Sequence, residues 1–204
     1  MSSTEVPIGK LELRWPEVAV RLAAKIPGLH FDSGASADQT IDEFVIRQVL
    51  REVLIDSLSN NFVTFKEVSY PSGGSRIDLT VGPRGRRSII AIELKGNASS
   101  VDGLKHDWGK MLELSEEYKL SIFAGMAPKN KYQYLEKELR ELSYPLKNGF
   151  SAHKLVQQSF SFSISQSVGA SSAALNEFIA FAWIWSIGVD SKSLPKIEYA
   201  LFQV

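Results

Sequence analysis

The stretch SRIDLTVGPRGRRSIIAIELKG, residues 75–96, decides the fold of this chain. Two apolar runs, IDLTV and SIIAIELK, are joined by GPRGRR, whose glycines and proline are typical of a turn. Such a pattern predicts a β-hairpin with an elaborated turn. Asp78 interrupts the first run, and Glu93 and Lys95 interrupt the second. A charged group is costly to bury without a partner, so these three residues require a reason for their positions.

Alternation along the strands predicts how this hairpin divides its residues between two faces. If the apolar faces of both strands align, Asp78, Glu93 and Lys95 converge on the opposite face, although parity alone leaves the register open. We expect only the apolar face to be buried. That face takes every second residue of each run, namely Ile77, Leu79, Val81, Ile90, Ile92 and Leu94.

Asp78 and Glu93 predict a site for a hard cation. Two carboxylates at neighbouring strand positions suit Mg²⁺, which keeps several waters for a phosphate to displace, and Mn²⁺ can substitute for it. Lys95 would stabilise developing negative charge or help to deprotonate an attacking water. This combination is what metal-assisted phosphodiester hydrolysis requires. The alternative is a structural cluster of ion pairs on the sheet.

Working outward from the hairpin, hydrophobic periodicity predicts helices and strands in an order typical of an α/β fold, with a mixed central sheet flanked by helices. We expect a single domain over residues 1–204, with a core at about 38–128 and a C-terminal extension at 129–204. The expected helices are 15–26, 38–59, 108–118, 129–143 and 173–187, and the further strands are 62–70, 119–127, 154–165 and 197–204.

The hairpin resembles the PD-(D/E)xK nuclease superfamily, which has the restriction-endonuclease-like fold. In that superfamily an acid on one strand is followed, after a turn, by acid-x-lysine on the next, here Asp78 and then Glu93-Leu94-Lys95. The resemblance covers about residues 38–128. The usual proline before the first acid is absent, because Arg76-Ile77 precedes Asp78.

The resemblance implies a Mg²⁺-dependent endo- or exonuclease acting on nucleic acid, with DNA favoured over RNA. The alternative is a catalytically inactive nuclease-fold module that binds or regulates. Many family members add a glutamate from the first core helix to the metal site. The resemblance gives that role to Glu43, which lies beside the apolar stripe near the helix start, rather than to Glu52.

Further basic and polar residues are candidates for contacts with nucleic acid. His106 and Lys110 lie near the start of the helix after the motif, where Lys110 would contact a phosphate and His106 would support the site. Capping and solvation are the alternative for both. The hairpin tip is expected either to grip a nucleic-acid backbone or to be a solvated turn, through Arg84, Arg86 and Arg87.

Composition limits the remaining classes of function. Net charge is zero, but residues 84–110 hold six basic and three acidic residues, a weak indication of a phosphate-facing side. Because the chain has no cysteine and three histidines, thiolate sites are excluded and a zinc site is not expected. The start lacks a secretory signal, and the apolar run at 178–189 is too short to cross a bilayer. We expect a cytoplasmic protein without membrane contact, in which that run forms a core helix or a homodimer interface.

Overall fold

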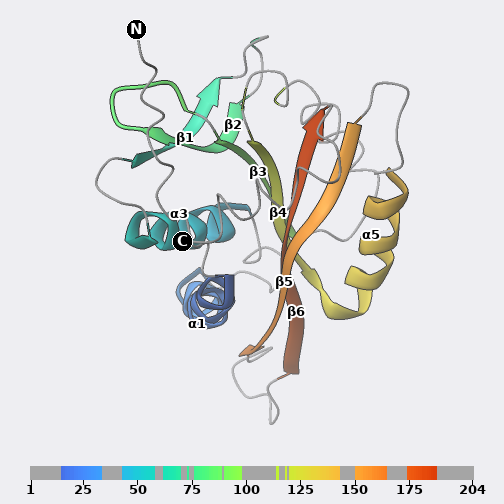
Figure 1. Cartoon of the computed structure of the whole chain (residues 1–204). Coiled ribbons are helices and arrows are strands. Elements are labelled where there is room, and N and C mark those ends of the chain that lie inside the picture. The colour runs from blue at the N-terminus through green and yellow to red at the C-terminus, as the bar shows by residue number, and fades with distance from the viewer. Residues whose placement is uncertain are drawn as a thin grey trace, which may run out of the picture.

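The computed structural model describes residues 15–33, 43–57, 62–69, 73, 76–88, 90–97, 114, 118, 120–142, 150–164 and 174–187. Its centre is a six-stranded sheet in the order β1-β2-β3-β4-β6-β5 (Figure 1). The strands are β1 (Phe62–Ser69), β2 (Arg76–Pro83), β3 (Ile90–Asn97), β4 (Leu120–Pro128), β5 (Phe150–Ile164) and β6 (Ala174–Ile187). The helices are α1 (Trp15–Ser33), α3 (Glu43–Ser57) and α5 (Lys129–Leu142).

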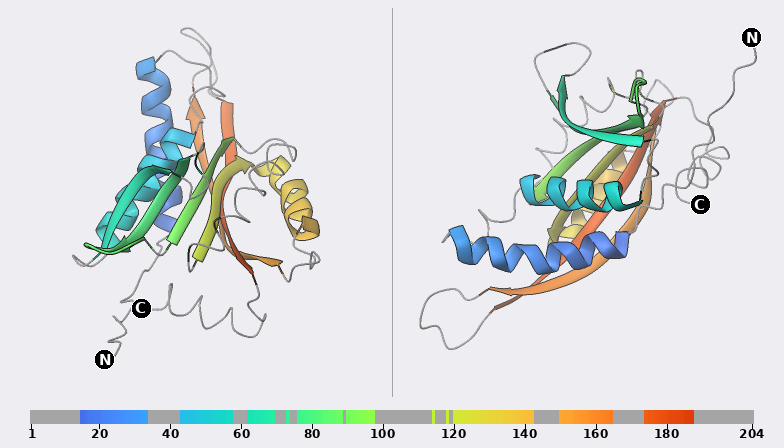
Figure 2. Two further views of the ribbon diagram at one scale, coloured as in Figure 1. Left: turned by 90° about the horizontal axis from the view of Figure 1, so that it is seen from above. Right: turned by 90° about the vertical axis from the view of Figure 1, so that its left-hand side faces the viewer.

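The sheet is mixed, as expected for this α/β fold. Its β3–β4 pair is parallel, and the other neighbouring pairs are antiparallel. Helices cover both faces: α1 and α3 lie side by side on one face, and α5 lies on the other (Figure 2). Among the described residues, no helix is long and apolar enough to cross a membrane.

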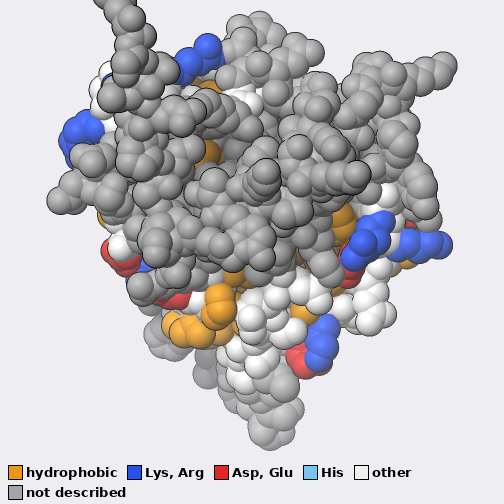
Figure 3. Space-filling view, viewed as in Figure 1, with side chains coloured by type: hydrophobic (Ala, Val, Ile, Leu, Met, Phe, Trp, Pro, Cys, Tyr) orange, Lys and Arg blue, Asp and Glu red, His pale blue; other side chains and the backbone are white. Residues whose placement is uncertain are grey.

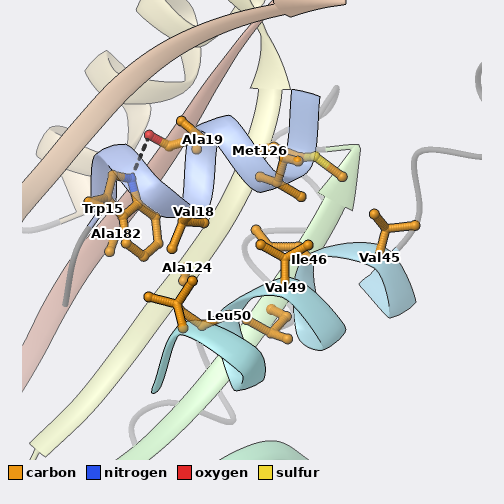
Figure 4. Packing of buried hydrophobic residues seen from close by; sticks show 14 of the residues in the cluster. Trp15, Val18, Ala19, Val45, Ile46, Val49, Leu50, Ala124, Met126 and Ala182 are labelled. Carbon is orange, nitrogen blue, oxygen red and sulfur yellow. Dashed lines mark hydrogen bonds between the residues drawn. The ribbon is translucent and has the colours of Figure 1, made fainter. Parts of the chain in front are cut away.

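Two hydrophobic clusters fill the space between the layers. The first joins α1 and α3 to one face of the sheet, with residues such as Val18 and Ile46 packing toward Ala124 (Figure 4). Trp15 anchors α1 to β6, because its Nε1 donates a hydrogen bond of 2.9 Å to the carbonyl of Ala180. The second cluster joins α5 to the opposite face.

Apolar spacing explains why α3 and α5 form and which side each buries. In α5 the buried residues Tyr132, Leu135 and Leu139 recur at intervals of three and four, which places them on one side of the helix. Its basic residues Lys129, Lys131, Lys137 and Arg140 are exposed. Blue basic side chains lie on the right-hand side of Figure 3, where Figure 1 shows α5. In α3 the buried set is Val45, Ile46, Val49, Leu50, Val53 and Leu54.

The helix predicted at residues 173–187 is wrong, because this segment is strand β6. β6 lies between β4 and β5 and is covered by helices on both faces. Its even-numbered residues Phe178, Ala180 and Ala182 join the first cluster, and its odd-numbered residues Ile179, Phe181 and Trp183 join the second. The stretch at 178–183, which is buried on both faces, is apolar at every position, so it lacks the polar alternation that identifies a half-exposed strand.

Other predicted boundaries agree more closely with the structure. The strands at 62–70, 119–127 and 154–165, and the helix at 129–143, are confirmed within the described residues. Helix α1 continues to Ser33 instead of ending near residue 26, since Pro27 removes one N–H from the helix without terminating it. The predicted strand at 197–204 lies outside the described residues, as does the predicted helix at 108–118 apart from Leu114 and Tyr118.

Candidate functional site

The register of the hairpin brings the two predicted metal ligands to neighbouring positions. β2 and β3 pair through Leu79 with Ile92, Thr80 with Ala91, and Val81 with Ile90. Asp78 and Glu93 are the next residues beyond the Leu79–Ile92 pair, one on each strand. The two acids therefore come from adjacent strands at the same end of the paired segment.

Asp78 lies at the point where regular pairing of β2 with β3 stops. Its Oδ2 accepts a hydrogen bond of 2.9 Å from the backbone N–H of Leu94. Since Asp78 belongs to β2, this N–H of β3 points toward the neighbouring strand, as donors of a ladder do. The carboxylate therefore replaces a strand carbonyl in the ladder, and one oxygen of Asp78 is used to hold the hairpin together.

The alternation of side chains also breaks at Asp78. Leu79 belongs to the cluster under α1 and α3, whereas Ile77 belongs to the cluster on the α5 side. Residues two apart in a regular strand share a face, so the backbone changes direction between them. On strand β1, Lys66 pairs with Leu79 and Val68 pairs with Ile77. Glu67, between them, is not part of the regular pairing and has a positive φ of 54°. Both strands are irregular beside the acid.

Glu93 is buried, which contradicts the expectation that only one face of the hairpin is covered. Its exposure is 4%, and Thr80 and Ala91 on the same face are fully buried. The reason is that Glu93 lies opposite Phe123 of β4, whose ring belongs to the core under α5. A buried carboxylate needs a cation, a proton or hydrogen bonds to offset the loss of hydration.

Lys95 and Glu43 meet at the end of β3. The Nζ of Lys95 lies 3.3 Å from Oε1 of Glu43, the first residue of α3. Both side chains are partly exposed, at 29% for Lys95 and 45% for Glu43. The structure therefore brings the predicted helix glutamate to the motif, where its carboxylate contacts the lysine. Glu52, the glutamate not chosen from the sequence, instead pairs with Lys25 of α1 at 2.6 Å.

Sequence reasoning missed Arg47 and Glu67, which complete this charged group. Arg47 lies one helical turn after Glu43, and its Nη1 is 3.0 Å from Oε1 of Glu67 and 3.9 Å from Oδ1 of Asp78. Oε2 of Glu67 lies 3.2 Å from Nη1 of Arg76. The spacing of four residues from Glu43 was the available signal, since it places Arg47 on the same side of the helix.

The donor set fits a cation with few protein ligands. Within the described ranges no three His, Cys, Asp or Glu residues form a group able to hold a metal, so Glu43 does not complete such a group with Asp78 and Glu93. Mg²⁺ is commonly bound by one or two carboxylates, with waters and substrate oxygens filling its octahedral shell. Asp78 and Glu93 carry the hard carboxylate oxygens that such a site would use.

Of the remaining predicted residues, the structure describes only the three arginines of the hairpin tip. His106 and Lys110 lie outside the described residues. The side chains of Arg84, Arg86 and Arg87 are exposed at the hairpin turn, which is closed by a 3.1 Å hydrogen bond from the Arg86 N–H to the Pro83 carbonyl. The turn begins six residues beyond Asp78, which corresponds to about 20 Å along a strand.

Comparison with known proteins gives little further information. No protein-family model matches the chain, and no curated protein matches it in sequence. Among solved structures, a chain of the electron cryomicroscopy structure of the DrdV–DNA complex is similar at 18% identity and a TM-score of 0.37. The match covers 54% of this chain and 76% of the other. At this level, the similarity carries no argument about function.

Proposed function

We propose that this protein is a Mg²⁺-dependent nuclease that hydrolyses phosphodiester bonds of nucleic acid, with DNA as the favoured substrate. The observation that carries the proposal is the hydrogen bond from the Leu94 N–H of β3 to Oδ2 of Asp78 on β2, which brings Asp78 to the strand segment that carries Glu93 and Lys95. The resemblance of these residues to the PD-(D/E)xK motif supports the same conclusion.

Each residue of the motif has a distinct role in this proposal. Asp78 and Glu93 hold Mg²⁺, and Mn²⁺ can replace it. When bound, the ion neutralises phosphate charge and lowers the pKa of a coordinated water. Lys95 stabilises the negative charge that develops on the phosphate or orients the attacking water. Glu43, 3.3 Å from the Lys95 ammonium, holds that side chain at the end of β3.

The two acids of the motif differ in their access to solvent. A carboxylate that is 4% exposed has lost nearly all contact with bulk water. Asp78 remains partly accessible, with 19% of its side chain exposed, so a site shared by the two acids would be reached from the Asp78 side. Such an arrangement allows a hydrated ion to enter while keeping Glu93 fixed.

An inactive nucleic-acid-binding module is the second candidate, and a specific observation favours it. Lys95 lies beside Glu43, and Asp78 lies near Arg47, so both residues have charged neighbours without a metal. A nuclease that has lost activity would retain this network as a structural element. Hydrolysis must therefore be measured directly.

The test is cleavage of plasmid DNA, single-stranded DNA and RNA by the purified protein with Mg²⁺, Mn²⁺ or EDTA. We expect metal-dependent cleavage that Asp78→Asn and Lys95→Ala each reduce by about a hundredfold or more, because each change removes charge from the reacting centre. Asparagine keeps an oxygen that can accept the Leu94 N–H. Glu177→Gln and Lys129→Ala are matched controls, since they disrupt a 2.8 Å ion pair of exposed residues that does not involve the motif.

Different results would identify which proposal fails. Cleavage that persists in EDTA, or in the Asp78→Asn variant, would show that the nuclease proposal is wrong. Binding of nucleic acid without cleavage under all conditions would support the inactive module. If the protein neither binds nor cuts nucleic acid, then Asp78, Glu93 and Lys95 form a structural cluster of ion pairs.

A further inference from the structure

Arg47 lies beside Asp78 of the motif and is partly exposed. Nη1 of Arg47 lies 3.9 Å from Oδ1 of Asp78. The other carboxylate oxygen of Asp78, Oδ2, accepts the hydrogen bond from the Leu94 N–H. The side chain is 21% exposed, so solvent or a ligand can reach it. It also lies over the ring of Phe44, 6.0 Å from the centroid, and Phe44 is itself half exposed.

Only part of the Arg47 guanidinium contacts acidic side chains in the segments that the structure describes. Within the described part of the chain, the ion-pair contacts of Arg47 to Glu67 and Asp78 both run through Nη1. Arginine has five N–H donors in a planar fork that matches two oxygens of a phosphate. The donors on Nη2 and Nε therefore remain for an anion that approaches from outside.

Glu67 holds this arginine in place at a cost in backbone conformation. A φ of 54° is uncommon for a residue with a side chain, and here it falls inside strand β1. The carboxylate of Glu67 contacts Arg47 with one oxygen and Arg76 with the other. Exposed ion pairs contribute little to stability, so they do not explain a strained residue, whereas strain of this kind concentrates at functional sites.

We propose that Arg47 binds a phosphate of the nucleic-acid substrate beside the bond that is cut, and that Glu67 positions Arg47 for this contact. The inference rests on the proposed function and adds two residues outside the motif. A cation bound by Asp78 would take over the charge compensation that Arg47 provides, and the guanidinium would then contact the substrate phosphate while Glu67 keeps it in place.

The experiment compares Arg47→Gln with Arg51→Gln, an exposed arginine one turn further along α3 that removes the same charge. Affinity for a short DNA duplex is measured in Mg²⁺ by fluorescence anisotropy over a range of salt, with Lys95→Ala in every protein so that DNA is not cut. We expect Arg47→Gln to lower affinity at least tenfold and to reduce the salt slope by about one, as when one phosphate is no longer neutralised. Arg51→Gln should leave both quantities unchanged.

Two further measurements separate phosphate binding from a structural role. Mn²⁺ binding, followed by calorimetry, should be equal or tighter in Arg47→Gln, because a positive charge beside Asp78 has been removed. Glu67→Gln should weaken DNA binding less than Arg47→Gln and add little in the double variant, since it acts through Arg47. A lower melting temperature for Arg47→Gln without changes in affinity and salt slope would overturn the inference.

The outcomes also distinguish this inference from the proposed function. If the motif cuts DNA and Arg47→Gln behaves as Arg51→Gln does, the inference is wrong and the nuclease stands. If the wild type does not cut DNA but Arg47→Gln still weakens binding with the smaller salt slope, Arg47 is a phosphate-binding residue of a module that does not hydrolyse, and the nuclease proposal is wrong. If the wild type neither binds nor cuts nucleic acid, both are wrong.

Discussion

Asp78 serves the fold and the proposed chemistry with different oxygens. Oδ2 completes the pairing of β2 with β3 through Leu94, and Oδ1 faces Arg47. Removing the carboxylate entirely would leave the Leu94 N–H without its acceptor, at a cost of about 1–3 kcal/mol. A loss of activity in Asp78→Ala would therefore mix folding with chemistry, which is why asparagine is the more informative replacement.

Gly125 of β4 lies opposite Lys95 of β3, and a methyl group at this position should disturb the backbone of the strand that carries Lys95. A Cβ there would lie 2.7 Å from the carbonyl oxygen of Lys95 and 2.9 Å from Cζ of Phe181. We expect Gly125→Ala to lower the free energy of unfolding by about 1–3 kcal/mol, because the backbone of β3 and a core ring leave no room. Urea denaturation measures this change.

Gly28→Ala in α1 is the matched control for that prediction. Nothing lies within 4 Å of a Cβ at Gly28, and alanine favours a helix more than glycine does. This variant should be as stable as the wild type or more stable. Equal destabilisation by the two substitutions would show that close packing against Lys95 is not the cause.

At the level of single residues, the sequence was sufficient to place Asp78, Glu93 and Lys95 on two neighbouring strands, but not to predict the side chains that surround them. Their positions follow from strand alternation and from the order acid, turn, acid-x-lysine. Arg47 and Glu67 reach the site because β1 and β2 are irregular at the same level, as the positive φ of Glu67 shows. No local pattern of residue types predicts such an irregularity.

Among the elements, the packing of α5 on the sheet encloses polar atoms. Ser121 Oγ, Tyr132 OH and Trp183 Nε1 are buried without a hydrogen bond to any part of the chain that the structure describes. Burial, with a smaller contribution from the charge of Glu136, raises the pKa of Tyr132. The folded protein therefore keeps the Tyr132 proton at a pH where the unfolded chain would lose it.

Tyr132→Phe should increase the free energy of unfolding at neutral pH by up to about 1 kcal/mol, because it removes a buried hydroxyl without a partner. Above about pH 10, where tyrosine ionises in the unfolded chain, the wild type should lose stability faster than the variant. Urea denaturation at pH 7 and pH 10.5 measures both effects. Tyr134→Phe on the exposed side of the same helix should change neither, and equal effects of the two variants would contradict the prediction.

The comparison of β6 with α5 shows which elements can be predicted from sequence. α5 has one buried and one solvated side, so its apolar residues recur at helical spacing and the prediction is confirmed. β6 is buried by neighbours on both faces, and its apolar run contains no period that separates a strand from a helix. Its conformation is set by pairing with β4 and β5, which lie elsewhere in the sequence.

Across the whole molecule, a net charge of zero means that any attraction to nucleic acid depends on local groups of basic residues. Replacing Arg84, Arg86 and Arg87 by glutamine should weaken DNA binding and lower the salt slope by about 0.9 for each phosphate that these arginines no longer neutralise. Replacing Lys129, Lys131 and Lys137 of α5 removes the same charge from another layer and should have no such effect. Equal effects of the two triple variants would show that the hairpin tip makes no specific contact.

Because β6 lies in the interior of the sheet but is the last described strand in the sequence, the sheet cannot be completed until late in synthesis. The motif hairpin is complete at Asn97, whereas the strand that fills the space between β4 and β5 ends at Ile187. A chain emerging from the ribosome would therefore carry every motif residue while one edge of β4 still lacked its partner. Apolar strand edges of this kind pair readily with other chains. Premature release before residue 174 should yield a polypeptide that aggregates, even though it contains the complete motif.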